Sequence, residues 1–187
     1  MTTGYQIKDQ FAPYFLTFQI VQWADIFTRK IYRDIVIESF KYCCENKGLE
    51  IYAYVIMSNH VHLIMRSKLG NLSGTIRDLK KFTSKRIIEA VINGNESRRD
   101  WLLLVFEYSA NGHNRNENFQ VWTHENHAVE LYTNKFIEEK INYIHQNPVK
   151  AGWVSYPEQY LYSSASFYAG MNGIFEPIVL SLGWKTT

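Results

Sequence analysis

The sequence predicts an α+β protein in which helices pack against a central antiparallel sheet. Two apolar segments rich in β-branched residues are separated by only two residues, which is typical of a β-hairpin. Between and after the expected strands lie segments with apolar residues at helical spacing, so the expected order is β-α-β-β-α-(β)-α. Of the 187 residues, 46% are hydrophobic and 16% aromatic, which allows a sizeable core.

The first half of the chain contains the most regular patterns. Tyr14–Val21 is rich in aromatic and β-branched residues, which predicts a strand. Thr28 is expected to cap a helix that runs to about Lys47, and Gly48 is expected to end it. The apolar positions of this helix at roughly helical spacing are Ile31, Ile35, Phe40 and Cys43.

The predicted hairpin and a second helix follow. Glu50–Met57 and His60–Ser67 are joined across Ser58-Asn59, and we expect them to form the centre of the sheet. Leu72–Ile92 predicts a long helix.

Patterns are weaker beyond this helix. Trp101–Tyr108 fits a strand or a helix, and Ser109–Asn118 is a polar, Asn- and Gly-containing loop. The segments 119–123 and 128–132 are expected to be short strands. A third helix is expected to begin at Thr133 or Asn134. We expect it to end near Asn147, because proline disfavours helical geometry in the residue before it.

The length fits a single domain over residues 1–187, with a core at about 10–155 and a tail, 156–187, that packs on it. Met1–Gln10 lacks the apolar stretch of a secretory signal, and the longest apolar run, Ile51–Met57, is too short to span a membrane. The two cysteines, Cys43 and Cys44, are adjacent and form no disulfide framework. A cytoplasmic location is therefore expected, with no membrane partner.

Charge is unevenly distributed although the net charge is only +2. The segment 66–99 contains nine Lys or Arg and three acidic residues. Such a segment can attract a phosphate backbone, although on charge alone a solvated helix face explains it equally well.

His60-Val61-His62 is the first candidate site. Residues two apart on a strand point to the same face, so both imidazoles project together while Val61 points to the other side. Two convergent nitrogens form half of a divalent-metal site, with positions left for oxygen ligands and a substrate phosphate. The alternative is a pair of structural histidines.

Tyr143 and Asn147 form the second candidate. They are four residues apart and therefore share one face of the expected helix, next to an apolar stripe of Ile137, Ile141 and Ile144. A phenol has a pKa of about 10, so its attack on a phosphodiester requires help of the kind that a metal supplies. Taken alone, a helical tyrosine is more often a packing residue.

Together, these segments resemble the single-tyrosine HUH transposases, in particular their REP-associated tyrosine transposase branch. The resemblance runs through most of the chain and is tightest from Asn142 to Gly152. The segments that carry it are Phe15-Leu-Thr-Phe18, Met57-Ser-Asn-His-Val-His-Leu-Ile64, the basic helix, Val121-Trp122 with His127, Asn142-Tyr-Ile-His-Gln-Asn-Pro-Val-Lys-Ala-Gly152, Pro157-Glu-Gln-Tyr160 and Tyr162-Ser-Ser164.

The resemblance implies a ferredoxin-like HUH nuclease fold and a metal-dependent DNA endonuclease and strand transferase. His60 and His62 would hold Mg²⁺ or Mn²⁺, and Tyr143 would attack DNA to leave a 5′-phosphotyrosine and a free 3′-hydroxyl. The third ligand of the family, often Gln, falls on Asn147, which is one methylene shorter. Gln146 is the neighbouring alternative, but it points about 100° away around the helix.

The resemblance also implies a bacterial, nucleoid-associated protein that binds single-stranded DNA folded into hairpins at repetitive palindromic elements. Exposed aromatic residues could stack on unpaired bases. His124 and His127 are possible substitute ligands but better fit turn roles, and Lys140 could contact a phosphate or remain solvated. The basic residues expected along the DNA phosphates are Lys80, Lys81, Lys85 and Arg86.

Two alternatives remain at this point. A domesticated protein of the same fold could bind nucleic acid with little or no cleavage. An unrelated zinc hydrolase would need a third strong ligand and a general base, but no carboxylate flanks the HxH strand at a typical spacing. The sequence also leaves open whether the protein is a monomer or a homodimer, and whether Tyr143 serves its own histidines or those of a partner.

Overall fold

The computed structural model describes residues 6–111 and 118–179 and contains one four-stranded antiparallel sheet. The strand order is β2-β3-β1-β4, so the hairpin strand β3 lies in the centre beside β1. The predicted α+β class, with helices packed on an antiparallel sheet, is confirmed. The strands are β1 (Tyr14–Gln19), β2 (Leu49–Ile56), β3 (His60–Ser67) and β4 (Val129–Glu130).

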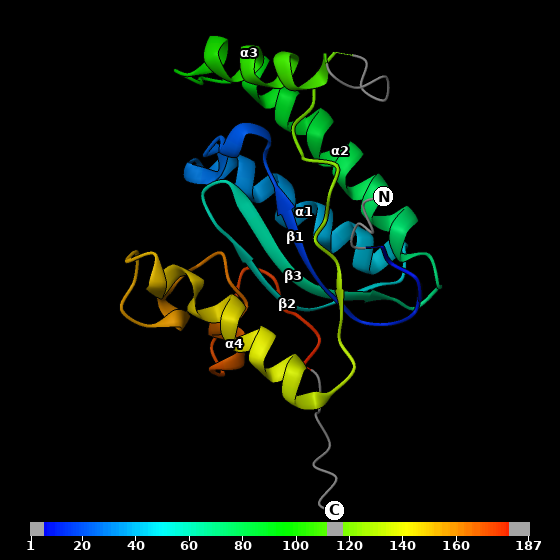
Figure 1. Cartoon of the computed structure of the whole chain (residues 1–187). Helices are drawn as coiled ribbons and strands as arrows, with labels where there is room; N and C mark the ends of the chain where they lie inside the picture. Colours follow the sequence, from blue (N-terminus) through cyan, green and yellow to red (C-terminus); the bar gives the residue numbers. More distant parts are fainter. Residues whose placement is uncertain (1–5, 112–117, 180–187) are drawn as a thin grey trace, which may run out of the picture.

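Helices cover both faces of this sheet, with α4 on one side and α1 and α2 on the other (Figure 1). The α-helices are α1 (Lys30–Asn46), α2 (Leu72–Asn93), α3 (Arg99–Ala110), α4 (Asn134–Lys150) and α5 (Ala165–Tyr168). Short 3₁₀ turns are η1 (Val21–Trp23), η2 (Ile26–Thr28) and η3 (Pro157–Gln159).

Alternation along the strands creates two separate hydrophobic clusters. On β3, Val61 and Leu63 face the cluster that contains the buried residues of α1, α2 and α3, whereas Ile64 faces the cluster under α4. On β1, Phe15 belongs to the α4 side. Because His60 and His62 alternate with Val61, both histidines lie on the sheet face that α4 covers.

The register between β1 and β3 fixes the neighbours of the two histidines. Thr17 pairs with His62, and Gln19 pairs with His60. The hairpin turn is closed by the amide of Met57, which donates to the carbonyl of His60 at 2.8 Å. The predicted hairpin is therefore confirmed within a residue at each strand end.

The expected N-cap of the first helix was wrong. Its N-cap is Arg29, which makes no side-chain capping bond, whereas Thr28 lies in η2 and donates its hydroxyl to the carbonyl of Asp25. Ile31, one of the apolar positions at helical spacing, is 49% exposed, because it lies in the first turn of the helix, next to an open groove toward α2. Gly48 does follow the helix, with a left-handed φ of 62°.

The segment after α2 differs most from the prediction. Trp101–Tyr108, which fitted a strand or a helix, lies within α3, and the helix extends to Ala110. Much of the loop predicted over Ser109–Asn118 falls outside the described residues. The strand predicted over 119–123 is reduced to an isolated bridge between Trp122 and Ile20, and 128–132 contains only the two-residue β4.

Helix α4 begins as expected and ends later than expected. The Thr133 hydroxyl accepts a hydrogen bond from the amide of Phe136 at 3.2 Å, so Thr133 is the N-cap. The predicted end near Asn147 was wrong, because Pro148 lies inside the helix, which continues to Lys150. Proline removes one backbone donor here, but the amide of Ala151 still bonds to the carbonyl of Asn147 at 2.9 Å and closes the last turn.

The chain after α4 returns to the sheet. The amide of Ile56 donates to the carbonyl of Tyr162 at 2.9 Å, and Ser163, Ser164 and Phe175 are buried. Within the described residues, no helix has the length and apolar character needed to cross a membrane.

Candidate active site

Two histidine side chains stand side by side on the central strand. The ring centroids of His60 and His62 lie 4.7 Å apart, and both rings lie on the face covered by α4. His62 is buried, with 6% of its surface exposed, and His60 is half-buried. The convergence predicted from strand geometry is confirmed, since Val61 between them is buried in the opposite cluster.

Each imidazole is oriented by a neighbouring oxygen at Nδ1. The Nδ1 of His62 lies 2.9 Å from Thr17 Oγ1, and the Nδ1 of His60 lies 2.7 Å from Asn59 Oδ1. An amide oxygen only accepts, so His60 donates its Nδ1 proton and carries its lone pair on Nε2. Metal-binding histidines are commonly oriented through the second ring nitrogen in this way.

Both histidines are held in the neutral form that can bind a metal. Burial, followed by the charges of His60 and Lys140, lowers the pKa of His62 to about 3. Burial also lowers the pKa of His60. A proton therefore does not compete for the ring nitrogens of His62 near neutral pH.

Helix α4 brings Tyr143 to this pair. The ring of Tyr143 lies 5.2 Å from that of His62 and 5.8 Å from that of Phe15, measured between centroids, and 39% of the tyrosine is exposed. The predicted apolar stripe anchors the helix, because Ile137 and Ile144 are buried in the cluster beneath α4. Tyr143 is thus fixed beside His62 of its own chain while part of its ring faces solvent.

Two lysines flank the tyrosine. Lys140 Nζ lies 5.5 Å and Lys150 Nζ 5.6 Å from the centre of the Tyr143 ring. Lys140 Nζ also lies 4.7 Å from the centre of the Phe15 ring. Lys150 was missed in the sequence analysis, although it is seven residues after Tyr143 and so falls on the same helix face. The two ammonium groups make this the positively charged side of the site.

Asn147 lies one turn after Tyr143 on α4. Its Nδ2 donates to the carbonyl of Tyr143 at 3.0 Å, and the side chain is half-buried. Gln146 is half-buried as well. The assignment of Asn147 as third ligand therefore stays a prediction.

The donor set can be compared with the requirements of different metals. No group of three or more His, Cys, Asp or Glu suitable for a metal occurs in the part of the chain that the structure describes. Zinc sites commonly use three or four protein ligands of these types, which does not favour the zinc hydrolase. The neutral imidazoles of His60 and His62 could hold a divalent metal, and the Mg²⁺ or Mn²⁺ that the resemblance implies stays a prediction.

His124 and His127 do not extend this donor set. The described residues contain no His cluster of three, so neither residue joins His60 and His62 in one site. His127 has a left-handed φ of 44°, and the preceding carbonyl, of Asn126, accepts a bond from the amide of Thr17 at 2.8 Å. These contacts fit the turn role expected for this segment.

The predicted DNA-binding lysines lie in the other helix layer. The buried residues of α2 pack in the cluster on the face opposite His60 and His62. Lys80 points inward: its Nζ donates to the carbonyl of Thr123 at 2.9 Å and to Asn126 Oδ1, and burial lowers its pKa to about 7. Lys81 and Lys85 are exposed.

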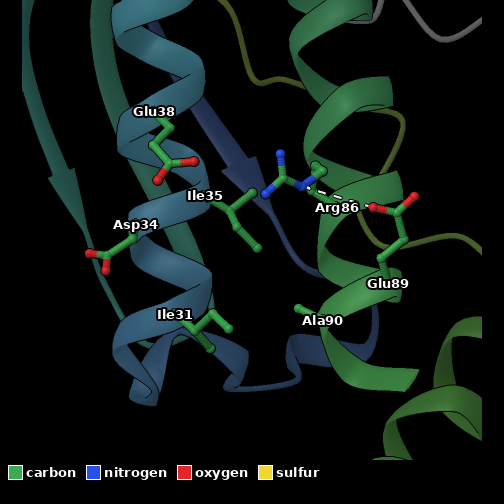
Figure 2. A pocket seen from close by; sticks show the side chains of 7 residues that line it. All are labelled: Ile31, Asp34, Ile35, Glu38, Arg86, Glu89 and Ala90. Carbon is green, nitrogen blue, oxygen red and sulfur yellow. Dashed lines mark ion pairs between the residues drawn. The ribbon is translucent and has the colours of Figure 1, made fainter. Parts of the chain in front are cut away.

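Arg86 also makes contacts within the protein. It points into an open groove of about 360 Å³ between α1 and α2 and pairs with Glu89 at 3.9 Å (Figure 2). The groove is lined by side chains such as Ile31, Asp34 and Glu38, a mixed apolar and acidic surface that does not favour a polyanion. Of the four predicted DNA contacts, Lys81, Lys85 and Arg86 are exposed, and both Lys85 and Arg86 pair with Glu89 at 3.9 Å on their own helix.

Comparison with known proteins agrees with this architecture. Residues 14–102 match the family of IS200-like transposases. A solved REP-associated tyrosine transposase, bound to a REP hairpin, has the same fold with a TM-score of 0.59 and 17% identity, over 100% of this chain and 99% of that one. A candidate transposase from Deinococcus radiodurans R1 has 15% identity and a TM-score of 0.44, over 79% and 97% of the two chains. No curated protein matches the sequence.

The fold is similar to that of a solved REP-associated tyrosine transposase, and in this chain two histidines on the central strand lie beside a tyrosine on the adjacent helix. The match over residues 14–102 and the shared fold agree with the predicted resemblance to the single-tyrosine transposases. The family match contains His60 and His62 but ends before Tyr143.

Proposed function

We propose that this protein cuts and rejoins single-stranded DNA with Tyr143 as the nucleophile. The observation that carries the proposal is the 5.2 Å separation between the rings of Tyr143 and His62, which brings a phenol to a pair of neutral, oriented imidazoles. His60 and His62, with Asn147, would hold Mg²⁺ or Mn²⁺. The bound metal would polarise the phosphoryl oxygens of the scissile phosphate.

In the proposed reaction, Tyr143 Oη attacks the phosphorus and the bond to the 3′-oxygen breaks. The phenol loses its proton and the leaving oxygen gains one, which yields a 5′-phosphotyrosine and a free 3′-hydroxyl. Because a phosphodiester is replaced by a phosphodiester, attack by another 3′-hydroxyl reverses the step and joins strands without an external energy source.

Lys140 and Lys150 would hold the phosphate beside the tyrosine. Their ammonium groups lie at similar distances from the centre of the Tyr143 ring, 5.5 and 5.6 Å. Fixed positive charges next to the reacting group stabilise the negative charge of a phosphoryl transition state. This pair would add to the predicted contacts from α2, among which Lys80 is bonded to the carbonyl of Thr123.

The proposed substrate is hairpin DNA with a single-stranded flank. The REP-associated transposase that shares this fold is bound to a REP hairpin, and the partly exposed Tyr143 can be reached by an unpaired strand. Since Tyr143 contacts His62 of the same chain, we expect one chain to complete the site and a monomer to be active.

A covalent adduct tests the proposal. Labelled DNA hairpins with single-stranded flanks are incubated with Mn²⁺ and the protein, and the products are separated on denaturing gels. We expect a protein–DNA adduct with the wild type and none with Tyr143→Phe, which keeps the ring contacts. An adduct that persists in Tyr143→Phe would refute the assignment. DNA binding without an adduct across many hairpins would favour the domesticated binding protein.

A further inference from the structure

Four rings form a row along the face of the sheet that α4 covers. The ring centroids of Trp23 and His60 lie 6.5 Å apart, those of His60 and His62 4.7 Å, and those of His62 and Tyr143 5.2 Å. The row follows the strands, because His62 and then His60 are the successive partners of β1 residues, and Trp23 lies in the turn that directly follows β1. The histidines thus separate an exposed indole from the tyrosine.

Trp23 is exposed although its neighbours are anchored. Its exposed fraction is 62%, whereas Val21 and Ala24 on either side are buried at 5% and 3%. The amide of Val21 donates to the carbonyl of Val121 at 2.9 Å. A tryptophan in a turn fixed in this way is presented to solvent by the fold rather than left on a loose segment.

The backbone at this turn is in an unfavourable conformation. Gln22 and Trp23 both have left-handed φ angles, 52° and 55°, which non-glycine residues seldom adopt. Such residues persist where surrounding contacts hold them, and they cluster at functional sites. Asn59 provides one of these contacts, because its Nδ2 donates to the carbonyl of Trp23 at 3.3 Å.

Asn59 also connects the indole to the metal site. The opposite end of the same amide, Oδ1, accepts from Nδ1 of His60 at 2.7 Å. One side chain therefore orients His60 and holds the backbone of Trp23. The position of the indole relative to His60 is fixed by this shared contact as well as by the ring contact.

We propose that Trp23 stacks on the base of the nucleotide on the 5′ side of the scissile phosphate, an inference that rests on the proposed function. In phosphoryl transfer, the attacking and leaving oxygens lie roughly in line on opposite sides of the phosphorus. The Tyr143 ring lies at one end of the row and Trp23 at the other, so with the phosphate at the histidines the leaving 3′-oxygen is directed toward Trp23. The nucleotide that carries this 3′-oxygen then lies over the indole.

The chemistry of the indole fits this position. An exposed aromatic ring stacks on any unpaired base, so the contact holds a single strand without specifying its sequence. The same stack would keep the released 3′-hydroxyl close to the phosphotyrosine after cleavage. Trp23 is thus a positioning residue for the strand that must later be rejoined.

Binding is measured first, apart from cleavage. The probe is a fluorescein-labelled hairpin with a single-stranded flank of mixed sequence, titrated in EDTA with the Tyr143→Phe protein. Adding the Trp23→Ala substitution to this protein should weaken DNA binding about tenfold, whereas Trp23→Phe should retain most of the affinity.

Trp101→Ala is the matched control, since Trp101 is 47% exposed on α3, in the opposite helix layer. Circular dichroism spectra and thermal melting curves check that the variants are folded. If Trp23→Ala does not fold, the comparison of Trp23→Phe with the wild-type side chain still tests the proposal. Equal affinity for the alanine variant, or equal loss in Trp101→Ala, would overturn the proposal.

The position of the stacked base is measured second. 2-Aminopurine is placed at each flank position in turn, and its fluorescence is compared between Tyr143→Phe and the double variant with Trp23→Ala. One position should be quenched by Trp23, and it should be the nucleotide 5′ of the cut mapped with wild-type protein and Mn²⁺. Quenching on the 3′ side of the cut, or none that depends on Trp23, would overturn the proposal.

The two proposals fail separately. If the adduct forms but no base responds to Trp23, the inference about Trp23 is wrong and the proposed function stands. If Trp23 quenches a base but no adduct forms with any hairpin, the 5′ assignment is overturned together with the proposed function, and the indole contact belongs to a binding protein.

Discussion

Thr17 on β1 and His62 on β3 are direct partners in the sheet register, and Thr17 Oγ1 lies 2.9 Å from His62 Nδ1. The hydroxyl therefore fixes the ring of His62 so that its Nε2 is directed away from Thr17. His62 owes its orientation to the neighbouring strand and its neutral form to burial.

Replacement of Thr17 by Val should weaken metal binding. The change keeps the shape of the side chain but removes the oxygen at His62 Nδ1, and loss of such a contact typically costs about 10- to 100-fold in metal affinity. Mn²⁺ binding is measured by the loss of the free-ion signal in electron paramagnetic resonance. Thr28→Val, at the exposed last position of η2, is the control and should bind like the wild type. Unchanged affinity in Thr17→Val would show that His62 does not depend on this contact.

Replacement of Lys140 by Ala should slow cleavage without weakening metal binding. Its ammonium lies beside Tyr143 and also lowers the pKa of His62. Its loss should reduce the single-turnover cleavage rate about 10- to 100-fold, raise the pKa of His62 as followed by NMR, and leave Mn²⁺ affinity unchanged or slightly higher. Lys135→Ala, exposed on the same helix, is the control. A reduced Mn²⁺ affinity in Lys140→Ala would contradict a role at the phosphate.

Variants at positions 146 and 147 separate the two possible third ligands. If Asn147 contributes its oxygen, Asn147→Ala should weaken Mn²⁺ binding about tenfold, and Asn147→Gln should restore it or improve on the wild type. Gln146→Ala should have no such effect. If Gln146→Ala weakens Mn²⁺ binding and Asn147→Ala does not, the third ligand is Gln146. Equal behaviour of all variants would leave the metal on the two histidines and solvent.

The stability of the protein should fall with acid because of His145. Burial lowers its pKa to about 4, and its Nε2 lies 2.8 Å from Ser164 Oγ. The unfolded state, with a histidine pKa of about 6.5, then binds the proton between pH 6.5 and about 4 while the folded state does not. The free energy of unfolding is therefore constant above pH 6.5 for this group and falls as pH drops, by up to ~1.4 kcal/mol per pH unit.

Urea unfolding at pH 7.5 and 5 checks this dependence. His145→Gln should lose less stability between the two values than the wild type does. His145→Gln should still lose some stability at pH 5. The pKa of His62 is also lowered, to about 3, so this residue likewise makes the free energy of unfolding fall as pH drops. An equal loss in wild type and His145→Gln would contradict the assignment.

Local features of this protein followed from the sequence because they depend on the period of one element. The two-residue repeat of a strand brings His60 and His62 to one face, and the helical repeat brings Asn147 under Tyr143. The hairpin, the Thr133 cap and the apolar stripe of α4 followed in the same way. The motifs around these residues also indicated the family.

Tertiary structure alone decided which elements meet. Periodicity shows which side of a helix is apolar but not which face of the sheet that side covers, so the sequence did not show that the basic helix α2 lies in the layer opposite the histidines. It likewise could not show that Lys80 turns inward, or that the turn after β1 places Trp23 next to His60. The sequence determined the groups that the site contains. The packing of α4 on the sheet placed Tyr143 beside its own His62, because only long-range burial of apolar side chains selects that face.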